Sequence, residues 1–382
     1  MNTTFRVGRI AGIDIGVNWT WFAIFGLIVW TLSQSIFPSE NPGLGDNTYI
    51  AMGAVAAIAF FASLLGHELG HALQARRDGM QIEGITLWLL GGVAKFKGQF
   101  PSAGAEFRIA IAGPLVSLVL GVAFVLIAML PLPETVDAVV SWLGYINLLL
   151  LVFNLLPALP LDGGRILRST LWHFKRSYAG STQLAAGIGR VFGFGFIATG
   201  IVLLFLSGTF QGVWFAFIGW FLLQASGAEA QYAANTRNLD GLTFRDLMTH
   251  APATVSPDAT LAEFMDGIAA TQRHTTYPVA VGATPVGLLI FRRVTEIPRT
   301  QWESTRVSEC MVPLSRVPVF EAAAPALDAL SGLGDSPIRR GLVLERGQLV
   351  GLISVSDLIR VLDVKQRGPS LQGLLTGRGR SR

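Results

Sequence analysis

Long apolar runs fill the first half of the chain and restrict its fold more than any other feature. Each is long enough to cross a bilayer, which takes about 20 apolar residues; the runs are 17–36, 50–76, 106–130, 136–156, 187–207 and 211–228. Only 14% of all residues are charged, against about 25% in soluble domains. Because a helix satisfies its own backbone hydrogen bonds in lipid, we expect a polytopic α-helical membrane protein of about six spans.

Lysine and arginine are distributed unevenly between the connections of these runs. The connections 37–49, 131–135 and 208–210 contain neither residue, whereas the opposite side carries many, among them Arg76 and Arg108. Positive charge collects on the cytoplasmic side of membrane proteins. With an even number of spans, this predicts a multi-pass protein of the cell membrane with both termini cytoplasmic. The net charge of +4 is modest, and this topology accounts for the excess of basic residues. We therefore expect the lipid bilayer as a partner and no nucleic acid.

The composition changes near residue 230, and an ordinary mixed α/β sequence begins at about 243. Val286-Gly287-Leu288 and Val350-Gly351-Leu352 mark an internal repeat of 64 residues. Such a repeat means two copies of one small unit, which usually pack against each other. We predict these domains: 1–229 as a transmembrane domain, 230–242 as a linker, 243–302 and 303–366 as the two repeats, and 367–382 as a basic disordered tail.

The second apolar run contains the motif His67-Glu68-Leu69-Gly70-His71. On a helix, positions i and i+4 share one face, so both imidazoles can bind one Zn²⁺ at about 2.0–2.1 Å. Glu68 lies beside them and can take a proton from attacking water. Counting back from Arg76 at about 1.5 Å per residue places the histidines roughly 8–14 Å inside the membrane. Ionisable residues at that depth are costly and usually functional; the alternative is a polar cluster that only stabilises a helix bundle.

A catalytic zinc needs three protein ligands and one open position. Glu134 and Asp137 lie on the wrong side of the membrane, and Glu106 is possible but starts a helix. Asp162 is the best candidate, because prolines break the helix before it and glycines free the backbone after it. Irregular backbone at membrane depth is tolerated where it lines a cavity. The alternative role for Asp162 is an N-cap of the next helix.

The HELGH motif and the later Asn154-x₂-Pro-x₂-Pro-Leu-Asp-Gly-Gly segment together resemble the site-2 protease family of intramembrane metalloproteases. The resemblance covers about residues 10–230 and implies that the predicted domain 1–229 is a transmembrane metalloprotease domain. It implies one zinc ion per chain, bound by His67, His71 and Asp162, with Glu68 as general base. It also implies that Asn154 contacts the substrate or the developing oxyanion.

Two further segments carry this resemblance. Trp88-Leu-Leu-Gly91-Gly92-Val93 is similar to a short strand near the family's active site, where Gly91 and Gly92 would bind an unwound substrate by strand addition; a plain turn is the alternative. Gly113-Pro114 resembles a helix-packing motif that often continues to an asparagine. Ser117 occupies that position here, which leaves its polar role open.

The two C-terminal repeats resemble tandem CBS domains, which often bind adenine nucleotides. The resemblance implies that Ser354 and Asp357 contact ribose in the second copy, whereas the first copy has Arg292 and Arg293 near that position. At most one nucleotide site is therefore expected. A structural role, or a homodimer formed through the repeats, remains open beside it, and Ser356-Asp357 also suits an ordinary helix start.

These features predict an intramembrane zinc-dependent endopeptidase that cleaves transmembrane segments of membrane-bound protein substrates in regulated proteolysis. The alternative is a membrane transporter or channel regulated by the CBS-like repeats. A transporter would show inverted repeats or several charges across its spans, and the charges here concentrate in one motif. A membrane di-metal oxidase would need more carboxylate and histidine ligands than the spans contain.

Overall fold

The computed structural model describes residues 4–366, apart from 90, 97, 208–210, 273 and 335. The chain divides into two compact units, one up to Ala233 and the other from Ala234. The predicted tail 367–382 and the connection 208–210 lie outside the described residues. The predicted linker 230–242 begins within a helix that continues to Leu239.

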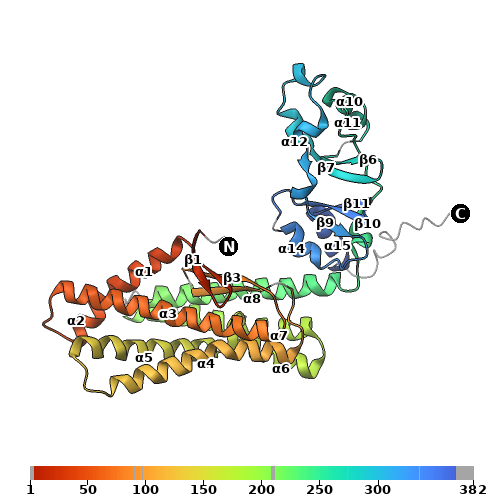
Figure 1. Cartoon of the computed structure of the whole chain (residues 1–382). Helices are drawn as coiled ribbons and strands as arrows, with labels where there is room; N and C mark the ends of the chain where they lie inside the picture. The colour runs from red at the N-terminus through yellow and green to blue at the C-terminus, as the bar shows by residue number, and fades with distance from the viewer. Residues whose placement is uncertain are drawn as a thin grey trace. The chain divides into compact units, whose positions relative to one another are not determined.

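Long helices make up most of the N-terminal unit, and several of them pack lengthwise (Figure 1). α4 is central to this layer and contacts α3, α5 and α6. The helices are α1 (Thr20–Thr31), which continues through a π-helical turn (Leu32–Ile36) into α2 (Phe37–Glu40), then α3 (Asp46–Arg77), α4 (Ala103–Ala128), α5 (Glu134–Asn154), α6 (Asp162–Lys175), α7 (Tyr178–Ser207) and α8 (Gln211–Leu239).

Among the described residues, five helical segments are long and apolar enough to cross a membrane: Thr20–Glu40, Asp46–Arg77, Ala103–Ala128, Glu134–Asn154 and Tyr178–Leu206. They contain most of the first five predicted runs. The sixth run, 211–228, lies in α8, which is long but is not among these five. Gln211 and Gln224 lower the hydropathy of its apolar part.

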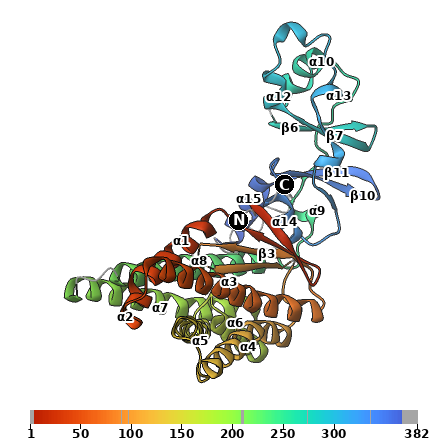
Figure 2. The ribbon, with the colours of Figure 1, turned by 60° about the vertical axis from the view of Figure 1, so that its left-hand side comes forward.

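A four-stranded sheet completes the N-terminal unit and lies beside the helices (Figure 2). Its order is β1 (Phe5–Ile10), β2 (Ile13–Val17), β3 (Ile82–Trp88) and β4 (Gly91–Phe96). β1 and β2 form one antiparallel pair, β3 and β4 form another, and β2 pairs with β3 in parallel. Both β3 and β4 contact α3. The sheet therefore places β4, one of its edge strands, next to the helix that carries the HELGH motif.

The C-terminal unit is an α/β domain pair, as predicted. Its first repeat contains α9 (Phe244–Leu247), β5 (Thr249–His250), α10 (Leu261–Asp266), α11 (Ile268–Thr271), β6 (Thr276–Val281), β7 (Thr284–Ile290) and α12 (Phe291–Thr295). The second contains α13 (Val307–Cys310), β8 (Val312–Pro313), β9 (Val319–Glu321), α14 (Asp328–Gly334), β10 (Arg340–Glu345), β11 (Gln348–Ser354) and α15 (Val355–Gln366).

The two repeats interlock through their first strands. The sheets have the orders β6-β7-β8 and β5-β11-β10-β9, so β5 pairs with a strand of the second repeat and β8 with a strand of the first. Each repeat also has its own apolar core. A third cluster, which includes Leu288, Val312 and Leu342, joins the two sheets. Neither repeat is therefore structurally complete without the other.

Candidate metal centre

The two histidines of the HELGH motif lie on one face of α3, as their spacing predicts. Their Nε2 atoms are 3.1 Å apart. The side chains are almost fully enclosed, since His67 is 2% exposed and His71 is 4% exposed. A buried imidazole loses its hydrogen bonds to water, which costs free energy unless a polar partner replaces them. These two facing rings therefore need a polar partner between or beside them.

Asp162 supplies that partner from a distant part of the chain. α5 ends at Asn154, the segment 155–161 holds Pro157 and Pro160, and α6 begins at Asp162. The Asp162 Oδ2 atom lies 3.1 Å from Nε2 of His67 and 3.2 Å from Nε2 of His71. The N-cap position of α6 is Leu161, with no side-chain cap. The carboxylate is thus directed at the histidines, and the alternative role as an N-cap is not observed.

One stripe of α4 holds both imidazoles from the other side. The Nδ1 atom of His71 lies 2.7 Å from the Ile109 carbonyl oxygen, and Nδ1 of His67 lies 2.9 Å from Ser117 Oγ. A carbonyl only accepts hydrogen bonds, so Nδ1 of His71 carries a proton, and in the neutral ring Nε2 keeps the lone pair that can bind a metal. Gly113 lies midway between Ile109 and Ser117 on α4. A Cβ atom at Gly113 would lie 2.2 Å from Nε2 of His71 and 2.6 Å from Nε2 of His67.

The sequence predicts only part of this stripe. The resemblance assigns Gly113 to helix packing and leaves the polar role of Ser117 open, and it gives no role to Ile109. The available signal was the spacing of four residues between Ile109, Gly113 and Ser117, which places all three on one helix face. Their roles depend on how α3 and α4 pack, which the spacing alone does not show.

The donor set fits a zinc ion. His67, His71 and Asp162 each offer one ligand atom, and these three atoms lie within 4.8 Å of one another. Around a tetrahedral zinc with ligands at about 2.0–2.1 Å, neighbouring donors are about 3.3 Å apart, close to the observed spacings. Two imidazoles and one carboxylate are a common ligand set of catalytic zinc, and bonds to the remaining nitrogen of each imidazole orient such ligands.

A pocket of about 340 Å³ opens onto these three side chains. Its lining also includes Glu68, Gly91, Gly92 and Asn154, so the structure brings together all the residues predicted for the N-terminal site. Gly92 packs against the base candidate, because a Cβ atom there would lie 2.4 Å from Glu68 Cγ. Trp88 and Phe221 close part of the pocket with their rings 6.3 Å apart.

Charged side chains near this pocket form a second buried group. Arg168 donates to Glu106 Oε1 at 2.7 Å from Nε and 2.5 Å from Nη2, and to Glu229 Oε2 at 3.0 Å. Its guanidinium also lies 5.0 Å from the centre of the Tyr178 ring. Glu106, a weaker candidate for the third ligand, is therefore paired with Arg168 rather than directed at the histidines.

At the end of α3, Arg108 donates to Asp78, which also accepts from Gln74 at 3.0 Å. The hydrogen bond from Arg108 lowers the pKa of the Asp78 carboxyl below its ordinary value. The carboxylate is therefore ionised at neutral pH and ties the end of the histidine helix to α4.

The residues predicted to contact a nucleotide lie in the C-terminal unit. Ser354 precedes α15, and its hydroxyl donates to Asp357 Oδ2 at 2.6 Å, while the Ser354 backbone N–H donates to the same oxygen at 2.9 Å. This pair caps the helix. A cavity of about 320 Å³ in the same unit is lined instead by Thr275, Arg292 and Arg340, among others. The nucleotide stays a prediction.

Comparison with known proteins gives consistent matches along the chain. The model of peptidase family M50 matches residues 55–134 and 131–196, and that of the CBS domain matches 244–297. The putative zinc metalloprotease Rip3 of Mycobacterium tuberculosis is 36% identical over 372 residues, covering 95% of this chain and 94% of the relative. A putative zinc metalloprotease of Synechocystis sp. is 31% identical, covering 95% and 96%. A solved site-2 protease from Methanocaldococcus jannaschii is 31% identical, with a TM-score of 0.42, covering 59% of this chain and 94% of that one.

Proposed function

This chain belongs to peptidase family M50, so it is a membrane-bound zinc metalloprotease, and from that premise we propose that it cleaves peptide bonds inside the transmembrane segments of other proteins. One observation carries the proposal. Two imidazoles and a carboxylate converge, with Glu68 beside them, in a pocket lined in part by α3 and α5, two helices apolar enough to span a membrane. An enzyme for soluble substrates has no need to hold these groups at such depth.

His67, His71 and Asp162 would hold the zinc ion. When bound, zinc supplies Lewis acidity, which polarises a peptide carbonyl and makes water more acidic. Glu68 accepts a proton from the attacking water and returns it to the leaving amine. Asn154, at the end of α5, would bind the substrate or the oxygen on which negative charge develops. Ser117 and the Ile109 carbonyl keep both imidazoles oriented by holding their Nδ1 atoms.

The edge strand β4 would hold the substrate in an extended form. A transmembrane helix shields its carbonyls, because each one accepts a hydrogen bond from its own helix, so the substrate must unwind before attack. An extended segment can add to an exposed sheet edge through main-chain hydrogen bonds. Gly91 and Gly92 of β4 line the metal pocket, and the absence of a side chain at Gly92 leaves room for both Glu68 and a substrate backbone.

We propose six crossings, with α8 as the sixth, so that both termini lie on one side of the membrane; the lysines and arginines of the connections on that side make it the cytoplasm. α7 and α8 approach each other through small residues, as membrane helices commonly do. A Cβ atom at Gly200 of α7 would lie 2.5 Å from the Gly212 carbonyl oxygen of α8, and one at Gly219 of α8 would lie 2.5 Å from the Gly193 carbonyl oxygen of α7. This close packing makes α8 part of the same helix layer.

For the CBS pair we propose an adenine nucleotide as regulatory ligand. The cavity of about 320 Å³ in this unit offers Arg292 and Arg340 for phosphates. Ser354 and Asp357, for which ribose contacts were expected, are engaged in capping α15. A homodimer formed through the repeats is a further proposal, which sedimentation of the full chain with and without ATP would test.

The proposed proteolysis is tested with the purified full chain and its Glu68→Gln variant. Both are incubated with model transmembrane peptides in detergent micelles, and zinc content is measured in parallel. We expect cleavage by the wild type alone, loss of cleavage with a chelator, and equal zinc in both proteins. Ion or solute transport in liposomes that survives Glu68→Gln, without peptide cleavage by the wild type, would instead favour the transporter or channel.

A further inference from the structure

Two arginines one turn apart on α6 have different surroundings. Arg168 is 2% exposed and its guanidinium donates to two carboxylates, those of Glu106 and Glu229. Arg165 forms no ion pair and no side-chain hydrogen bond with any other residue that the structure describes, and its Nε atom is buried without a partner. Since buried polar groups nearly always have partners, the unpartnered Nε atom of this half-buried side chain points to a ligand.

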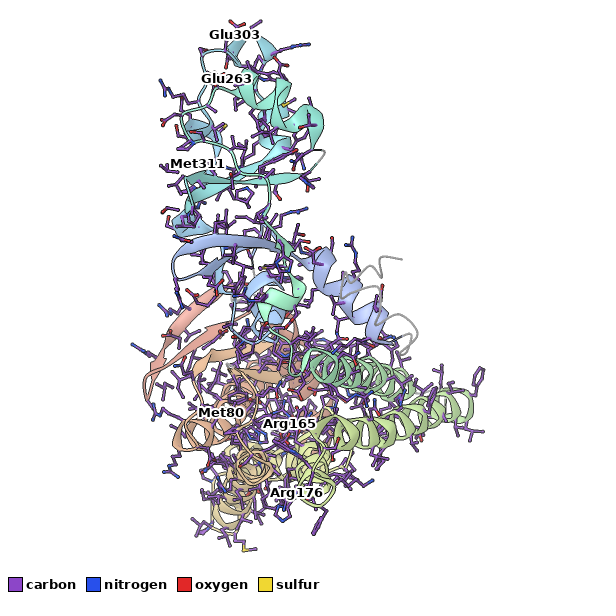
Figure 3. All side chains as sticks on the ribbon, turned by 90° about the vertical axis from the view of Figure 1, so that its right-hand side faces the viewer. Met80, Arg165, Arg176, Glu263, Glu303 and Met311 are labelled. Carbon is purple, nitrogen blue, oxygen red and sulfur yellow. The ribbon has the colours of Figure 1, made fainter. Side chains whose placement is uncertain are left out.

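Arg165 lies at the junction of two cavities. It lines the metal pocket of about 340 Å³ and also a second chamber of about 560 Å³. Phe96, Pro160 and Ala225 line both cavities as well. Figure 3 labels Arg165 among the helices of the N-terminal unit, together with Met80, which lines the second chamber. A molecule that moves from the metal pocket into the second chamber therefore passes the Arg165 guanidinium.

Its position on the helix directs Arg165 toward the metal site. Asp162 and Arg165 are three residues apart and therefore neighbours on the surface of α6. Asp162 faces the histidines, and Glu229 and one oxygen of Glu106 accept from Arg168, while Glu106 also attracts Arg165 electrostatically. The charged side chains that line the metal pocket are the carboxylates of Glu68 and Asp162 and the guanidinium of Arg165. With a divalent cation in place, their summed charge is positive, so the pocket favours an anion.

We propose that Arg165 is a carboxylate-binding residue of the active site. Hydrolysis breaks the C–N bond of a peptide; the water oxygen joins the carbonyl carbon, and the water protons end on the new amine, so each turnover releases one carboxylate at this place. A guanidinium binds a carboxylate through two parallel hydrogen bonds. The ligand is therefore a carboxylate, supplied either by the new C-terminus of the product or by an acidic side chain of the substrate next to the cut.

This inference rests on the proposed function, so the test measures binding apart from cleavage. Three apolar peptides of one sequence serve as probes: one with a free C-terminal carboxylate, one with a C-terminal amide, and one amide with glutamate as its last residue. Affinities are measured by fluorescence anisotropy in micelles for full-length Glu68→Gln protein, with zinc and after chelation. The same background carries Arg165→Gln, Arg165→Lys or, as a matched control, Arg176→Gln at the exposed far end of α6 (Figure 3).

We expect the Glu68→Gln protein to bind a carboxylate peptide about tenfold more tightly than the plain amide, as a charge-assisted hydrogen bond allows. Arg165→Gln should abolish the preference, Arg165→Lys should keep part of it, and Arg176→Gln should leave it unchanged. Preference for the free terminus identifies the product as the source, and preference for glutamate identifies a substrate side chain.

Equal affinity for all three peptides would overturn the inference. So would a preference that survives Arg165→Gln; if chelation then removes it, the carboxylate binds the zinc ion and not the guanidinium. Cleavage assays of the protein with Glu68 intact run beside the binding assays. A wild type that cleaves nothing, while the preference dependent on Arg165 persists, would contradict the proposed proteolysis and leave the carboxylate site standing.

Discussion

The two units of the chain place their polar side chains in opposite ways. In the N-terminal unit the buried ionisable residues include His67, His71, Glu106, Asp162 and Arg168. Across the described part of the C-terminal unit, every aspartate, glutamate, lysine, arginine and histidine side chain is at least partly exposed. Its ion pairs lie at the surface; the partners Arg245 and Glu345, for example, are 48% and 46% exposed. Its buried polar residues are hydroxyl-bearing, such as Thr276 and Ser354.

This difference shows which unit carries the chemistry. Burying an ionisable group costs several kcal/mol unless it is paired, so a chain keeps such groups only where they act or hold acting groups in place. In the N-terminal unit they lie around one pocket. In the C-terminal unit, serine, threonine and acidic residues cap helices at a few tenths to about 2 kcal/mol each. The predictions below test this contrast.

The largest effect is expected from Gly113→Ala. The new Cβ atom would occupy the space between the two Nε2 atoms, so zinc binding and peptide cleavage should both fall to background. Zinc content by mass spectrometry and cleavage of a model peptide measure this. Gly187→Ala is the matched control, because a Cβ atom there meets nothing within 4 Å. Full zinc content in a folded Gly113→Ala protein would show that this gap is not the metal site.

The buried charge group gives the next largest effect. Arg168→Met leaves the Glu106 carboxylate, which is 0% exposed, without its counter-ion, and removing one partner of a buried pair costs about 3–5 kcal/mol. Denaturant unfolding in micelles should show that loss. Arg245→Met in the C-terminal unit breaks an exposed pair and should cost about 0–1 kcal/mol. Equal losses in the two variants would remove the contrast between the units.

Ser117→Ala tests the second contact of His67. Loss of the hydrogen bond to Nδ1 should weaken zinc binding about 10–100-fold, as for other partners of metal ligands, while the fold persists. Competition with a zinc chelator of known affinity measures the change. Ser117→Thr, which keeps a hydroxyl, should restore part of the affinity. Unchanged zinc affinity in Ser117→Ala would mean that the packing of α4 alone orients His67.

Ser354→Ala should have the smallest effect. It removes the cap of α15 and should lower the stability of the C-terminal unit by about 1 kcal/mol, with no change in zinc content or basal cleavage. Thermal unfolding with probes in each unit separates the two effects. Loss of ATP binding, without loss of stability, would instead favour the ribose contact that the CBS resemblance implies.

Much of the fold follows from patterns in the sequence. Apolar runs predict the helices that can span a membrane, because length and hydropathy are local properties. The repeat of Val-Gly-Leu predicts the α/β pair, which the structure and the CBS match support. The exchange of β5 and β8 between the two sheets was not predictable, since strands of two residues leave no periodic signal.

The candidate site likewise contains some features that the sequence predicts and others that it does not. His67 and His71 share a face because their spacing requires it, and Asp162 stands out as an acidic residue in a broken helix at membrane depth. Arg165 and Arg168 look alike in sequence, as two basic residues three positions apart in one segment. Their different surroundings depend on Glu106 and Glu229, which are 59 or more residues away in the chain, and only tertiary packing reveals this.

X-ray absorption at the zinc edge, on the purified full chain and on Asp162→Ala, tests the central claim most directly. The account predicts one zinc ion per wild-type chain, with two imidazole nitrogens and a carboxylate oxygen at about 2.0–2.2 Å. It also predicts that Asp162→Ala loses the metal or the carboxylate contribution. A wild-type spectrum without two histidines, or an unchanged spectrum in Asp162→Ala, would contradict it.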